Sequence, residues 1–171
     1  MMSLILILMF SFFNSNPPDT YQTPMHIKVA DSIQEAVGDR LAARHKMKLI
    51  GQSGALFDAI NELGFRFQVT GPKTKDELRG ILVDCTEELV NAVNQTEGIS
   101  QYLGSYPFTV DKVDLIIFLY DEHMRDIYYP SYATAFVNSG RLRYCTLEEG
   151  GMGYKTREYE SYEEALKALG R

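Results

Sequence analysis

The sequence predicts an α+β domain whose helices pack on one face of a mostly antiparallel sheet of about four strands. Two segments with helical spacing of apolar residues flank a segment in which apolar residues alternate with polar ones. A nearly continuous apolar run and two short strand-like segments then follow without an intervening helix. Because helices and strands do not alternate regularly along the chain, this order fits a mostly antiparallel sheet better than a doubly wound parallel one.

A helix and a strand are the first two expected elements. Apolar residues recur every fourth position over residues 29–44, which indicates a helix. In residues 55–70 apolar side chains occupy odd positions and polar ones even positions, as in a strand with one covered face. The first half of that segment, residues 56–63, also fits one or two turns of helix, so the strand is expected most clearly from Glu62 onward.

The strongest helix in the sequence is expected to begin at Thr74. Gly71 and Pro72 end the preceding strand, and Thr74 followed by Glu77 forms a capping-box pattern. One apolar stripe then continues along the segment, which predicts a helix that packs along its whole length. The residues of this stripe are Leu78, Ile81, Leu82, Cys85, Leu89, Ala92 and Val93.

The C-terminal half is expected to supply three strands and a short helix. Residues 113–120 form a nearly continuous apolar run that indicates a central strand. Residues 132–137 and 141–147 are strand-like and are separated by Asn-Ser-Gly, which favours a hairpin. A second capping-box pattern, Ser161 with Glu164, predicts a last helix that ends at Gly170.

Composition and charge exclude several classes of protein. The 171 residues suit one domain, and 45% hydrophobic with 23% charged residues is typical of a globular fold. The net charge of −6 repels a phosphate backbone, which argues against general nucleic-acid binding. One basic cluster lies where the first helix is expected to end and complements the helix dipole there. It consists of Arg40, Arg44, His45, Lys46 and Lys48.

An apolar leader precedes the domain. Residues 4–13 (LILILMFSFF) are long enough for a signal-peptide core but shorter than the ~20 residues of a membrane-spanning helix. A proline-containing linker follows, so residues 1–24 are predicted to form a leader or membrane tether and residues 25–171 the domain. No basic residue precedes the run and no A-x-A-like site follows it. A buried N-terminal strand in a cytoplasmic protein is therefore the alternative.

Three segments carry a family resemblance. They are 49–54 (LIGQSG), 77–85 (ELRGILVDC) and 106–109 (YPFT). With these segments the chain resembles, over about residues 45–120, an uncharacterised family of bacterial envelope-associated proteins. The resemblance implies an exported protein with one small domain, and it implies no activity, cofactor or functional residue.

Few residues form a pattern that could carry catalysis. The segment 51–54 differs from a nucleophile elbow because Ala55 stands where glycine is required. Asp121, Glu122 and His123 follow the central strand and are weak candidates for metal binding or acid–base chemistry, with a solvated acidic loop as the alternative. His26 and His45 lack partners at zinc-ligand spacing, and the glycine-rich loop 149–155 lacks the spacing of a phosphate loop.

Cysteines and tyrosines give two further hypotheses. If the chain is exported, Cys85 and Cys145 can form one disulfide that ties the main helix to the hairpin. Tyrosines are concentrated between residues 128 and 162, which suggests a partner surface, although tyrosine also favours strands. The candidates for this surface are Tyr128, Tyr129, Tyr132, Tyr144 and Tyr154.

We therefore expect a non-catalytic domain, exported or tethered in the cell envelope through residues 4–13, that binds a protein partner or supports an assembly. No cofactor is expected. One alternative is a small hydrolase or metal-dependent enzyme that uses Asp121, Glu122 and His123. The other is a cytoplasmic domain whose N-terminus is a core strand.

Overall fold

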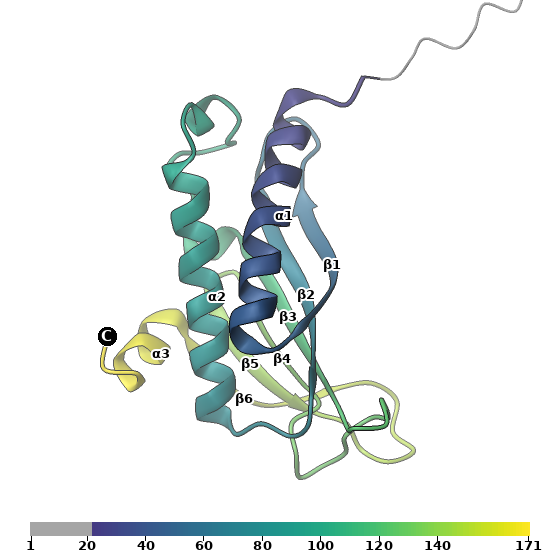
Figure 1. The fold of residues 1–171 in the computed structure, drawn as a ribbon. Coiled ribbons are helices and arrows are strands. Elements are labelled where there is room, and N and C mark those ends of the chain that lie inside the picture. The colour runs from purple at the N-terminus through teal and green to yellow at the C-terminus, as the bar shows by residue number, and fades with distance from the viewer. Residues whose placement is uncertain (1–21) are drawn as a thin grey trace, which may run out of the picture.

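The computed structural model describes residues 22–171 as one sheet covered by helices (Figure 1). The helices are α1 (Met25–His45), α2 (Lys75–Gln95) and α3 (Tyr162–Ala168), with two short 3-10 helices at Ile99–Gln101 and Val110–Lys112. The strands are β1 (Lys48–Ala55), β2 (Glu62–Thr70), β3 (Val113–Tyr120), β4 (Thr134–Asn138), β5 (Arg141–Thr146) and β6 (Lys155–Ser161). The predicted α+β class is confirmed.

The strands are neighbours in chain order, β1-β2-β3-β4-β5-β6. Only β2 and β3 run parallel, joined by the crossover helix α2, and the other four neighbouring pairs are antiparallel. The prediction of about four strands was wrong, because the described residues form six.

The strands that sequence reasoning missed, β1 and β6, are the two edges of the sheet. β1 contains Gly51 and Gly54 and has little buried side-chain area. β6 reads KTREYES, and its side chains that point toward the helices, Glu158 and Glu160, are acidic. Neither strand buries an alternating apolar face, so neither shows the period-two pattern that reveals a strand in a sequence.

The strand predicted over residues 55–70 is confirmed only from Glu62 onward. Residues 56–61 form a loop in which Phe57 is almost fully exposed and Ile60 is buried. The backbone of Ile60 forms an isolated β-bridge with Leu103. The alternation in this part of the sequence therefore did not correspond to a strand.

Helices α1 and α2 lie side by side across one face of the sheet (Figure 1). Alternate residues of β2 and β3, such as Phe65 and Ile117, point toward them and are fully buried. At Gly38 of α1 an added Cβ would lie 2.9 Å from Leu49 and 3.1 Å from Phe65, so this glycine permits the close packing of helix and sheet. Buried Gln34 fastens the same helix by donating to the carbonyls of Ser53 and Gly64, each at 2.8 Å.

Local sequence signals placed the starts of two helices and one hairpin correctly, whereas the first helix, predicted over residues 29–44, spans Met25–His45. Both predicted capping boxes are present, Thr74 with Glu77 at α2 and Ser161 with Glu164 at α3. The predicted hairpin joins β4 to β5, and positive φ angles at Ser139 (49°) and Gly140 (68°) match the turn that such hairpins use.

The predicted leader and most of the linker, residues 1–21, lie outside the described residues. The division between leader and domain therefore stays a prediction, as does the alternative of an N-terminal core strand. No helix within residues 22–171 is long and apolar enough to cross a membrane.

Candidate functional site

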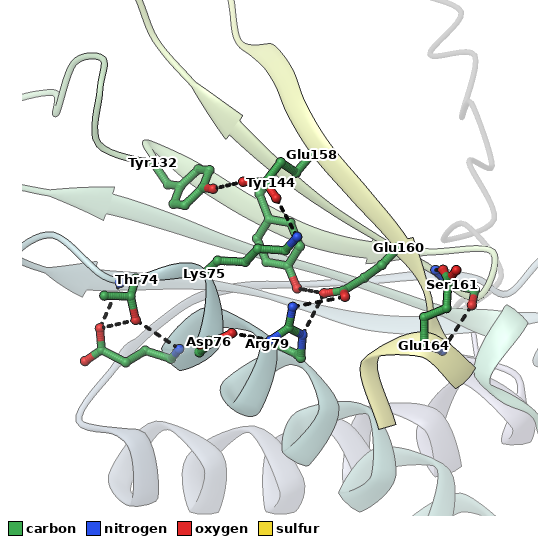
Figure 2. Close-up of polar contacts among 11 residues, drawn as sticks. Thr74, Lys75, Asp76, Arg79, Tyr132, Tyr144, Glu158, Glu160, Ser161 and Glu164 are labelled. Atoms are coloured by element: carbon green, nitrogen blue, oxygen red, sulfur yellow. Dashed lines mark hydrogen bonds and ion pairs between the residues drawn. The ribbon is translucent and has the colours of Figure 1, made fainter. Parts of the chain in front are cut away.

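A polar cluster lies between α2 and the edge strand β6 (Figure 2). The carboxylate of Glu160 accepts hydrogen bonds from Arg79, through Nε at 2.9 Å and Nη2 at 3.1 Å, and from the hydroxyl of Tyr144. The guanidinium of Arg79 also contacts Asp76. Arg79 is 8% exposed and Tyr144 is fully buried, so this part of the cluster belongs to the interior.

A second set of contacts continues the cluster toward solvent. Glu158 pairs with the ammonium of Lys75 and accepts a hydrogen bond from the hydroxyl of Tyr132. These contacts hold the pKa of Glu158 below its ordinary value. Burial and the Glu158 carboxylate raise the pKa of Tyr132 to about 12, and burial beside Glu160 raises the pKa of Tyr144 further still.

The contacts of this cluster attach β6 to α2. Each carboxylate already pairs with a cation and with a tyrosine hydroxyl, and the raised pKa values keep both tyrosines protonated at neutral pH. A general base or nucleophile needs a free lone pair facing a substrate. Here each carboxylate accepts from a cation and from a tyrosine hydroxyl of the protein itself.

The sheet face opposite the helices, called the open face below, is the larger candidate surface. Its centre is a half-buried apolar strip of Ile116 and Phe118 on β3 and Phe136 on β4. Their strand neighbours point to the helix side and are buried. No helix of the described domain packs on this strip (Figure 1).

Charged residues border this strip on both sides. On the side of β1, Arg66 pairs with Asp114 and donates to the Ser53 hydroxyl at 3.0 Å. Burial, followed by the nearby Asp114 carboxylate, raises the pKa of Glu62. On the side of β6, the guanidinium of Arg143 lies 5.6 Å from the centre of the Phe136 ring.

The tyrosines predicted as a partner surface divide into two groups. Tyr144 is fully buried, so the prediction was wrong for this residue. The hydroxyl of Tyr132 donates to Glu158 in the polar cluster and is therefore not free to bind a partner. Tyr128, Tyr129 and Tyr154 are 41%, 61% and 46% exposed, in the two loops that follow β3 and β5. The ring of Tyr154 lies 6.4 Å from that of Phe118, which joins the loop after β5 to the open face.

The triplet Asp121, Glu122 and His123 is not brought together as a site. The carboxylate of Asp121 accepts from the backbone amides of His123 and Arg125 and pairs with the Arg125 guanidinium, so it organises its own loop. These contacts lower its pKa. Glu122 and His123 extend into solvent with 83% and 66% of their side chains exposed.

The surface hollow beside this loop, about 610 Å³, is lined by Asp121 together with Met124, Arg125, Asp126 and Tyr128. A second hollow, about 550 Å³, lies between α1 and α2 and is lined by ten residues, none of them acidic, histidine or cysteine. Within residues 22–171 no group of three histidine, cysteine or acidic side chains is arranged to hold a metal ion.

Cys85 and Cys145 are both free and buried. Cys85 lies in α2, where burial raises the pKa of its thiol. Cys145 lies on the open face, with its Sγ 3.5 Å from the hydroxyl of Thr156. The two thiols therefore belong to different sides of the sheet, and the predicted bridge is not formed in this structure.

The other residues considered from the sequence have structural roles. Segment 51–54 lies within β1 rather than in a turn, and the hydroxyl of Ser53 contacts Arg66 and Asp114. His26 contacts the Leu56 carbonyl at 2.9 Å. His45 is 3.8 Å from Asp84, and burial lowers its pKa. Loop 149–155 connects β5 and β6, and the basic cluster at the end of α1 pairs partly with Glu88.

Neither a family model, nor a curated protein, nor a solved structure matches the chain. The resemblance to bacterial envelope proteins therefore rests on the residues quoted above and stays a prediction.

Proposed function

We propose that this protein is a non-catalytic binding domain of the cell envelope, held at a membrane or exported by its N-terminal segment, and that it binds a protein partner through the open face. The observation that carries the proposal is the half-buried apolar strip of Ile116, Phe118 and Phe136, which no helix of the described domain covers, on a sheet whose other face packs against α1 and α2. Apolar side chains bordered by charged and aromatic residues are the usual composition of a protein interface.

Three exposed tyrosines extend this surface beyond the end of the sheet. Tyr128, Tyr129 and Tyr154 have large rings that lose little conformational freedom on binding. The Arg157 guanidinium lies 5.0 Å from the ring centre of Tyr129 and restrains it. Tyr154, whose ring lies 6.4 Å from that of Phe118, connects the second loop to the strip, and exposed tyrosines are among the residues that dominate binding energy at interfaces.

The polar groups also favour binding over catalysis. The Glu160 and Glu158 carboxylates are engaged with cations and tyrosines, and the Asp121 carboxylate is engaged with its own loop.

We expect the double variant Glu122→Ala/His123→Ala to capture the partner as well as wild type does. If it instead abolishes a measurable hydrolysis, the alternative of a small enzyme replaces this proposal.

Site-specific photo-crosslinking tests the surface directly. A photoreactive phenylalanine analogue at Tyr159 or Tyr154, both on or beside the open face, should give a discrete cross-linked product in cells that express the protein. The matched controls carry the analogue at Glu35 and Asp39, which are exposed on α1. Cross-links at the α1 positions alone would contradict the proposal.

The envelope location is tested separately. Fractionation of cells followed by N-terminal sequencing should find the protein with the membrane, or in the exported fraction without residues 4–13. A cytosolic product that retains Met1 would refute export and tethering and leave the binding surface to be judged by its own experiment.

A further inference from the structure

Two arginines on β5 differ from the other arginines of the chain. Arg40, Arg44, Arg66, Arg79, Arg125, Arg157 and Arg171 each pair with a carboxylate. Arg141 and Arg143 are exposed and make no ion pair within residues 22–171. In a protein of net charge −6, two adjacent cations without carboxylates form a local positive region on the open face.

Their spacing matches an extended chain. Arg141 and Arg143 lie two residues apart on one side of β5, with Leu142 between them buried on the other side. Side chains two residues apart in a strand are separated by roughly 7 Å. Acidic residues at alternate positions of an extended peptide have the same separation, so two carboxylates can meet two guanidinium groups at once.

The surroundings complete a shallow site. A hollow of about 200 Å³ is lined by Arg141, Arg143, Thr156 and Tyr159. Tyr159 lies opposite Arg143 on β6 and is 73% exposed, while Phe136 packs beneath the Arg143 guanidinium. These four residues come from β5 and its neighbour β6, so the hollow lies on the sheet face over these two strands.

From this arrangement we infer that the hollow receives an extended acidic segment of a protein partner, with carboxylates at alternate positions bound by Arg141 and Arg143 and the peptide backbone packed on Tyr159. The inference rests on the proposed function and names the chemistry of its partner. The net charge of the whole chain opposes a nucleic acid as the occupant, because a long phosphate backbone is repelled over a larger area than this pair can offset.

Fluorescence anisotropy with the full chain tests the inference. The probe is a labelled ten-residue peptide with glutamate at every second position, and the matched peptide carries glutamine instead. Wild type should prefer the glutamate peptide, and added salt should weaken binding because the contacts are between charges. The double variant Arg141→Gln/Arg143→Gln should bind it about tenfold more weakly, as expected for the loss of two exposed ion pairs.

The control variant Lys28→Gln/Lys167→Gln removes the same charge from exposed positions elsewhere and should bind like wild type. Equal binding of the two peptides by wild type would overturn the inference, as would unchanged binding by the arginine variant. Preferential binding of an oligothymidylate that is lost in the arginine variant would also overturn it, by assigning the site to phosphate. Cross-linking at Tyr159 that persists despite such a failure would leave the proposed function standing.

Discussion

Replacing Glu160 by leucine should destabilise the domain strongly, because Glu160 neutralises a buried cation. Its carboxylate accepts two hydrogen bonds from Arg79, at 2.9 and 3.1 Å, and one from Tyr144. Without it, the Arg79 guanidinium stays in the interior with only Asp76, whose side chain is 84% exposed. The buried hydroxyl of Tyr144 would also lose its acceptor.

The expected cost follows from this geometry. Removing one partner of a buried ion pair typically costs about 3–5 kcal/mol, mostly because the other charge is left uncompensated. For a domain of this size, that loss lowers the melting temperature by roughly 6–20 °C. Circular dichroism during urea and thermal denaturation measures both quantities, provided that the transitions are two-state.

A compensated variant distinguishes this explanation from general damage to β6. The triple variant Glu160→Leu/Arg79→Met/Tyr144→Phe removes the charge and the hydroxyl together with their acceptor. It should recover most of the lost stability and lie within about 1–2 kcal/mol of wild type. The reasoning would be refuted if the single variant Glu160→Leu were as stable as wild type, or if the triple variant were no more stable than the single one.

Three further predictions concern the packing of two glycines, the ionisation of Glu158 and the burial of the two cysteines. Gly64→Ala should cost about 3 kcal/mol or more, because its Cβ would lie 1.6 Å from a backbone oxygen of β3, whereas Gly80→Ala, with nothing within 4 Å, should be neutral or stabilising in the same denaturation assay. The folded-state pKa of Glu158 lies below its ordinary value of 4.5, so its stabilisation is complete above that pH and is lost as the pH falls through the lowered value. Melting temperatures measured from about pH 6 to about pH 3 should therefore fall less in Glu158→Gln than in wild type, and parallel curves would contradict this. Cys85 and Cys145 should react with a thiol reagent only after unfolding. If the reagent adds no mass to the unfolded protein before reduction, the two cysteines form a disulfide instead.

The sequence predicted two kinds of feature: those set by a few neighbouring residues, and those marked by a regular spacing of apolar residues. The capping boxes at Thr74 and Ser161 and the Asn-Ser-Gly turn depend on side chains a few residues apart, so they could be placed directly. Helix α2 and strand β3 bury long apolar series and were also found. Edge strands β1 and β6 lack such series, so they were missed although each pairs with the strand next to it in the sequence.

The candidate surface could be predicted only in part. The concentration of tyrosines was visible, but the sequence does not say that Tyr144 points into the core while Tyr129 points out. Arg79 and Glu160, which form an ion pair, are 81 positions apart, and no regular spacing in the sequence indicates that they meet. The lack of an ion pair at Arg141 and Arg143 is likewise a property of the folded domain, because the carboxylates that pair with the other arginines are placed by the fold.

Hydroxyl-radical footprinting of the free protein and of its non-covalent complex with the partner identified by cross-linking tests most directly whether the open face is the binding surface. Oxidation of Tyr159 and Tyr154, exposed on and beside that face, should fall severalfold in the complex. Oxidation of Phe57 and Tyr106, which are exposed in the loops between β1 and β2 and between α2 and β3, should not change. Protection of Phe57 or Tyr106 with unchanged oxidation of Tyr159 and Tyr154 would contradict the account.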